Sequence, residues 1–176
     1  MELVPTFDKL VLCLLATLTG RLSFDVLSNF MLVGNEGVNY YAEAHLSNWN
    51  AWIHTIFMPI TIYGMLFWIP SLFNLNPTKA KNLILFLYFL YFGHYYHMSK
   101  INSILYLILY SYTVKRAINV YSYEYNKSYL IKNYIGNQGY LISRGLLIST
   151  FSLGIQEFVG HYLGGDIPSK IGRAHV

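Results

Sequence analysis

Charge is scarce in this chain of 176 residues. Charged side chains make up 11% of it and hydrophobic ones 55%, whereas roughly 25% of a typical soluble domain is charged. Cysteine is almost absent, since Cys13 is the only one. These shortages exclude an ordinary water-soluble globule, a highly charged disordered tail and an intramolecular disulfide scaffold. The net charge of +4 comes with no basic motif for nucleic acid. An integral membrane protein is the class that remains.

Long apolar runs predict the organisation, because about 20 apolar residues cross a bilayer as a helix. No charged residue occurs from Ala44 to Thr78, and within this stretch Ile53–Phe73 is the clearest span. Pro59 lies inside that span and predicts either a kink or a fresh helix start. The segment Asn74–Lys81 is rich in turn-forming residues and predicts a polar connector.

The next apolar run, Leu83–Val114, is too long for one span. As a single helix it would measure about 48 Å at 1.5 Å per residue, whereas a bilayer core is about 30 Å thick. We therefore expect two short spans with a tight turn near Ser99–Ser103. The polar and basic stretch Lys115–Gln138 follows, and Gly139–Gly160 predicts a fourth span with Arg144 near its start.

The sequence thus predicts an all-α fold, a polytopic membrane bundle of about four transmembrane helices in one domain, residues 1–170. Leu10–Leu18 is as apolar as a signal-peptide core, but acidic Glu2 and Asp8 precede it where such a peptide is basic. We expect an N-terminal helix at the membrane interface instead. The segment 171–176 resembles translated sequencing adapter, so we expect a scar that truncates the natural C-terminus.

Five histidines precede that scar, and counting membrane crossings places them all at one face of the bilayer. They are His45, His54, His94, His97 and His161. A histidine near hydrocarbon is costly and usually functional, and imidazole binds iron, zinc and copper. A single such histidine is more often an interfacial or hydrogen-bonded residue, but the joint pattern favours a metal site. Counting positive charges would turn this face to the lumen; we predict only that the five share a side.

The spacing of the polar residues refines this hypothesis. Asn50 and His54 are four residues apart, as are Glu157 and His161, and each pair would share one face of an α-helix. His45 and His54 are nine apart, which puts them about 180° apart on an unbroken helix. They can meet at one metal only if the chain bends between them.

Two stretches, YYAEAHLSNWNAWIHTIFMPI and IQEFVGHYLGGDIPSK, carry motifs that resemble those of a known family. That family is the 2-hydroxy fatty acid (2-hydroxypalmitate) dioxygenases, small membrane proteins of the endoplasmic reticulum. The motif positions here are His45, Asn50, His54, Gly160, His161, Asp166 and Pro168. The family commonly has a glutamine four residues before the last histidine, where this chain has Glu157.

The resemblance implies an Fe(II)-dependent enzyme of fatty acid α-oxidation, which uses dioxygen to shorten 2-hydroxy fatty acids by one carbon, including those from phytosphingosine degradation. It implies His45, His54 and His161 as metal ligands. Asn50 would support them, and Glu157 would be a fourth ligand or a base. The implied partners are the 2-hydroxy fatty acid, dioxygen and membrane lipid, at the endoplasmic reticulum.

Other functions remain open. A non-enzymatic lipid-binding or scaffold protein of the membrane would carry lipid without stoichiometric metal. A channel or transporter is disfavoured because only Arg144 and Glu157 are charged within the expected spans, both near span ends. A di-iron desaturase is disfavoured because that class uses more histidines in repeated clusters.

Overall fold

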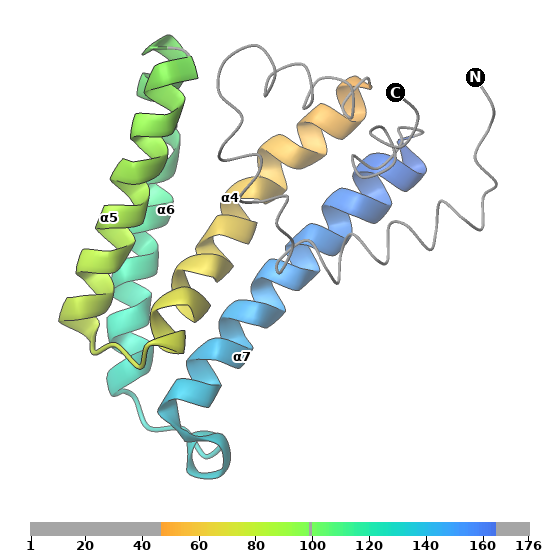
Figure 1. Ribbon diagram of the computed structural model, residues 1–176. Coiled ribbons are helices and arrows are strands. Elements are labelled where there is room, and N and C mark those ends of the chain that lie inside the picture. Colours follow the sequence, from red (N-terminus) through yellow and green to blue (C-terminus); the bar gives the residue numbers. More distant parts are fainter. Residues whose placement is uncertain (1–46, 99, 165–176) are drawn as a thin grey trace. The chain divides into compact units, whose positions relative to one another are not determined.

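The structure is a computed structural model that describes residues 47–98 and 100–164 (Figure 1). Its helices are α4 (Asn48–Leu72), α5 (Pro77–Met98), α6 (Lys100–Asn126) and α7 (Lys132–Ile155), and a π-helix, η1 (Gln156–Leu163), continues α7. These residues form no strand, so the predicted all-α class is confirmed for them. The expected N-terminal helix at Leu10–Leu18 lies outside the described residues.

One helix of the described part, α4, is long and apolar enough to cross a membrane. It contains nearly all of the predicted span Ile53–Phe73. The predicted division of the second apolar run is also found, since α5 ends at Met98 and α6 begins at Lys100. The four-span membrane bundle itself stays a prediction, because lysine, asparagine and many tyrosines interrupt the apolar character of the later helices.

The chain divides into two compact units, residues 1–58 with 150–176, and residues 59–149. The boundary in α4 falls at Pro59, which has no backbone N–H and so removes one helical hydrogen bond. Even so, α4 continues through Pro59, and the fresh helix start that was one of its two predicted outcomes does not occur. The predicted single domain over residues 1–170 stays a prediction.

The connector between α4 and α5 has the local chemistry of a tight turn. Asn74 adopts a left-handed backbone with φ of 47°, which asparagine tolerates better than most residues. Asn76 then caps α5, because its Oδ1 accepts a hydrogen bond of 3.0 Å from the backbone N–H of Lys79. Pro77 occupies the first helical position, where its missing N–H costs nothing.

Helices α5 and α6 form a hairpin within residues 59–149. Tyr88 fixes their register, since its hydroxyl donates to the Leu107 carbonyl at 2.7 Å and its ring lies 5.6 Å from that of Tyr106. Helix α6 extends to Asn126, well beyond the expected span end at Val114. Its continuation is stabilised by burial of one face at Ala117, Tyr121 and Glu124. Composition therefore indicated where the apolar run stops, not where the helix stops.

Helices α4 and α7 approach closely where both carry glycine. A Cβ added to Gly145 would lie 2.7 Å from the Gly64 carbonyl oxygen and 2.9 Å from the Phe67 Cβ. No larger residue fits there without moving a backbone, which is the usual role of small residues at close helix crossings. Nearer its start, α7 is interrupted at Gly136, whose φ of 72° is readily adopted only by glycine.

Candidate functional site

The π-helix η1 changes which residues share a face with His161. In an α-helix, residues five apart are separated by about 140°, so Gln156 and His161 would point in different directions. A π-helix closes its hydrogen bonds between residues five apart and turns by about 80° per residue, so residues five apart are separated by only about 50°. Accordingly Gln156, Gly160 and His161 are the buried residues of η1, whereas Glu157 is only half-buried. Glu157 is four residues before His161, and its expected pairing with His161 stays a prediction.

Two of the predicted ligands, His54 of α4 and His161 of η1, lie together. Their Nε2 atoms are 3.2 Å apart although 107 residues separate them in the sequence. The ring centroids are 5.1 Å apart and the ring planes are inclined at 76°, so the two imidazoles meet edge to edge through their Nε2 corners. Both are buried, with 7% of His54 and 1% of His161 exposed. Burial of two imidazoles costs free energy unless their nitrogens are hydrogen-bonded or bound to an ion.

The distance between these nitrogens is compatible with a shared metal ion. Two imidazole nitrogens bound at about 2.1 Å lie about 3.0 Å apart at a right angle and about 3.4 Å apart at the tetrahedral angle. The observed 3.2 Å lies between these values. It equally suits a hydrogen bond in which one imidazole donates to the other. The donor set therefore fits iron, zinc or copper, with imidazole as the ligand type.

Asn50 contacts the opposite nitrogen of His161. Its Nδ2 donates to His161 Nδ1 at 3.2 Å, and the Asn50 side chain is fully buried. In this arrangement the neutral His161 carries its proton on Nε2 and donates to His54. Metal binding by Nε2 requires the proton on Nδ1 instead, and a turned Asn50 amide would accept it through Oδ1. Asn50 can thus serve both states of the histidine pair.

Gly160 makes room for that amide. A Cβ on Gly160 would lie 2.5 Å from Asn50 Oδ1, which is closer than real carbon and oxygen atoms approach. The glycine beside the last histidine therefore has a specific steric role, and the side chain it accommodates is the one that contacts His161.

Two further hydrogen bonds join α4 to the end of α7 around this pair. The Ser152 hydroxyl donates to the Phe57 carbonyl at 2.7 Å, and the Trp49 indole N–H donates to the Val159 carbonyl at 3.2 Å. They lie on either side of the histidines along α4. The backbone that carries His54 and His161 is thereby fixed from two directions, as a preorganised site requires.

The other predicted site residues cannot be placed beside this pair. His45 and Asp166 lie outside the described residues. His94 and His97 belong to the last turn of α5, and their side chains are outside the described part. Within residues 47–98 and 100–164, no group of three histidine, cysteine or acidic side chains lies close enough to hold a metal. The three-histidine site and the shared side of the five histidines stay predictions.

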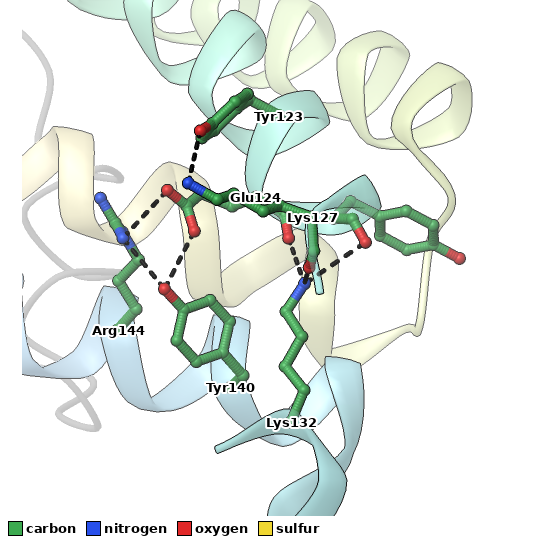
Figure 2. Close-up of polar contacts among 7 residues, drawn as sticks. Tyr123, Glu124, Lys127, Lys132, Tyr140 and Arg144 are labelled. Atoms are coloured by element: carbon green, nitrogen blue, oxygen red, sulfur yellow. Dashed lines mark hydrogen bonds and ion pairs between the residues drawn. The ribbon is translucent and has the colours of Figure 1, made fainter. Parts of the chain in front are cut away.

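A second polar cluster, which the sequence analysis missed, ties α6 to α7 (Figure 2). The Glu124 carboxylate is 5% exposed and lies 3.2 Å from the Arg144 guanidinium. The Tyr140 hydroxyl donates to the same carboxylate at 2.9 Å and accepts from Arg144 at 3.1 Å. The sequence did contain one indication of this cluster, because Glu124 is the only acidic residue between positions 59 and 149.

Lys132 closes the end of α6 beside this cluster. Its ammonium donates to the backbone carbonyls of Glu124 and Lys127, which have no helical partner at a C-terminus (Figure 2). Burial lowers the pKa of the Lys132 amine from its ordinary value, and the nearby Glu124 carboxylate opposes that shift. Lys127 instead donates to the Tyr123 hydroxyl at 2.7 Å, and this bond raises its pKa. The cluster has the features of a structural tie between helices.

Comparison with known proteins gives no relative for this chain: no family model, no curated protein and no solved structure matches it.

Proposed function

We propose that this protein is a membrane enzyme of the endoplasmic reticulum that uses Fe(II) and dioxygen to shorten 2-hydroxy fatty acids by one carbon. The observation that carries the proposal is the buried pair His54 and His161, whose Nε2 atoms lie 3.2 Å apart. The resemblance of the two surrounding motifs to the 2-hydroxy fatty acid dioxygenases supplies the substrate class and the metal. His45 is proposed as the third ligand.

A membrane location is supported by α4 and by the surface of the later helices. Large apolar side chains such as Ile101, Ile108 and Leu147 are 72%, 64% and 71% exposed. Exposure of this extent on successive helices is typical of a surface that contacts lipid or another protein. A membrane location would suit a substrate with a long fatty acyl chain.

The chain's own residues would hold and orient the reacting groups. His54 and His161 present two nitrogens in a fixed geometry, and Asn50 sets the protonation of His161 through its Nδ1. Bound ferrous iron would supply Lewis acidity and dioxygen activation, which no side chain provides. Burial of the pair keeps bulk water from the reacting centre. One 2-hydroxy acid and one dioxygen give the shortened acid, carbon dioxide and water, a balance that needs no external reductant.

The direct test is mass spectrometry of 2-hydroxypalmitate after incubation with purified protein, Fe(II) and air. We expect the acid shortened by one carbon, and we expect its formation to stop in His54→Gln and His161→Gln variants that keep the helical circular dichroism of the wild type. Tyr134→Ala, which changes a side chain that is 80% exposed, serves as the control. If both histidine variants form as much shortened acid as the wild type, the assignment is wrong.

The alternative is a non-enzymatic lipid-binding or scaffold protein, which the exposed apolar side chains also favour. In that case the 3.2 Å contact between His54 and His161 is a structural hydrogen bond. Purified protein would then carry lipid without stoichiometric metal, and no shortened acid would form.

A further inference from the structure

A groove between α5 and α6 is lined by two lysines and by apolar side chains. Its volume is about 320 Å³, and Lys81 and Lys115 line it together with the apolar side chains of Leu85 and Ile118. The polar ends of Ser111 and Asn119 lie along the same wall. Both lysines are exposed, so their ammonium groups can turn toward a ligand in the groove.

The register of the hairpin brings the two lysines to one level. Tyr88 is level with Leu107, because its hydroxyl donates to that carbonyl. Seven residues toward the start of α5 is position 81, and seven residues along α6 is position 114, next to Lys115. By the same count Lys79 lies level with Arg116. Of these four cationic residues, only Lys81 and Lys115 line the groove.

Within residues 59–149 no carboxylate is paired with Lys81 or Lys115. Glu124 is the only carboxylate between positions 59 and 149, and it pairs with Arg144. A pair of lysines lining a groove is complementary to an anion, and the amide of Asn119 can donate to its oxygens.

An apolar belt continues from this level along the same hairpin. Its exposed side chains are Phe86, Phe89, Leu90, Ile104, Leu105, Ile108 and Leu109. On α5 these side chains cover positions 86 to 90, a rise of about 6 Å, and on α6 positions 104 to 109, a rise of about 8 Å. The belt is therefore long enough to contact part of an acyl chain beside the groove.

We infer that this groove binds an anionic phospholipid, with the headgroup phosphate between Lys81 and Lys115 and an acyl chain along the apolar belt. The inference rests on the membrane location in the proposed function but not on the proposed chemistry. Charge selects the lipid at the mouth of the groove, and apolar contact holds it along the helices.

The test uses full-length protein in detergent, to which phosphatidylglycerol or phosphatidylcholine with identical acyl chains is added, and bound lipid is counted by native mass spectrometry. We expect preference for phosphatidylglycerol. Each lysine near an anionic surface contributes about fivefold to binding, so Lys81→Gln with Lys115→Gln should weaken it about 25-fold. The matched control is Lys100→Gln with Lys127→Gln, which removes the same charge elsewhere and should change binding less than twofold.

Arginine at both positions should restore the preference, since the requirement is for positive charge. The inference is overturned if the control pair weakens lipid binding as much as the Lys81 and Lys115 pair does, or if the wild type binds the two lipids equally. It is also overturned if millimolar inorganic phosphate competes as strongly as lipid. Iron content and 2-hydroxypalmitate turnover are measured on the same variants without added lipid. If the wild type does not turn over 2-hydroxypalmitate, the proposed enzyme is wrong and the groove is unaffected. If the wild type shows no preference for phosphatidylglycerol, the groove is wrong and the proposed enzyme is unaffected.

Discussion

The two ring nitrogens of His161 have different neighbours, and these neighbours determine which nitrogen carries the proton. Nε2 faces His54 and Nδ1 faces Asn50, each at 3.2 Å. A neutral imidazole carries one proton, so whatever accepts or donates at Nδ1 decides whether Nε2 has a lone pair for a metal. Asn50, which can do either, is therefore the residue through which the metal affinity of His161 is set.

Replacement of Asn50 tests this role. Asn50→Leu keeps the size of the side chain but cannot accept a hydrogen bond from Nδ1–H, and loss of such a support typically lowers metal affinity 10- to 100-fold. Asn50→Asp can accept, so it should retain affinity close to that of the wild type. Titration of metal-free protein with Co(II), followed by its visible absorption, measures both. If the Leu and Asp variants bind Co(II) with equal affinity, the residue at position 50 does not determine the protonation of His161 Nδ1.

Gly160 offers a steric test at the same site. In Gly160→Ala the new Cβ would meet Asn50 Oδ1 at 2.5 Å, and overpacking of this kind costs about 1–3 kcal/mol. Gly93→Ala is the control, because nothing lies within 4 Å of a Cβ there. Alanine is a better helix former than glycine by about 1 kcal/mol, so the Gly93→Ala control should unfold at a slightly higher temperature than the wild type. Thermal unfolding in detergent compares the two. A Gly160→Ala variant as stable as Gly93→Ala would contradict the packing described.

At the scale of elements, the positions of the helices could be predicted from the sequence, but the end of α6 and the π-helical geometry of η1 could not. The apolar runs located α4 and the division between α5 and α6, because a membrane-length argument depends only on composition. The extension of α6 past Val114 depends on burial of Tyr121 and Glu124 against other helices, which no local pattern records. The π-helix was not predicted either, since spacing arguments assume α-helical periodicity. His54 and Asn50 were found because α4 does have that periodicity.

The tie between α6 and α7 predicts an asymmetric response to substitution. Arg144→Met leaves the Glu124 carboxylate without its cation; since the Arg144 side chain is 33% exposed and Tyr140 still donates to Glu124, the cost is below that of a fully buried pair, about 1–3 kcal/mol. The double variant Glu124→Gln with Arg144→Met removes both charges and should recover most of that loss. Arg116→Met removes an exposed cation and should change stability by less than about 0.5 kcal/mol. Urea unfolding measures all three, and a double variant no more stable than Arg144→Met would contradict the ion-pair account.

At the scale of the whole molecule, composition and site point to the same class of protein by independent routes. The chain has few charges, and its described residues include one helix able to cross a membrane and many exposed apolar side chains, which together favour a membrane setting. A pair of buried histidines from distant parts of the sequence favours a metal in that setting. The sequence could nominate the histidines, but only folding could show that positions 54 and 161 meet.

The measurement that tests the central claim most directly is the iron content of protein purified without oxygen, determined by elemental analysis per chain. The account predicts one iron per chain in the wild type and in Tyr134→Ala. It predicts that His54→Gln and His161→Gln each lose most of it, because both nitrogens are needed to hold the ion. Protein that folds and binds lipid but contains no iron, or histidine variants that keep the full amount, would contradict it.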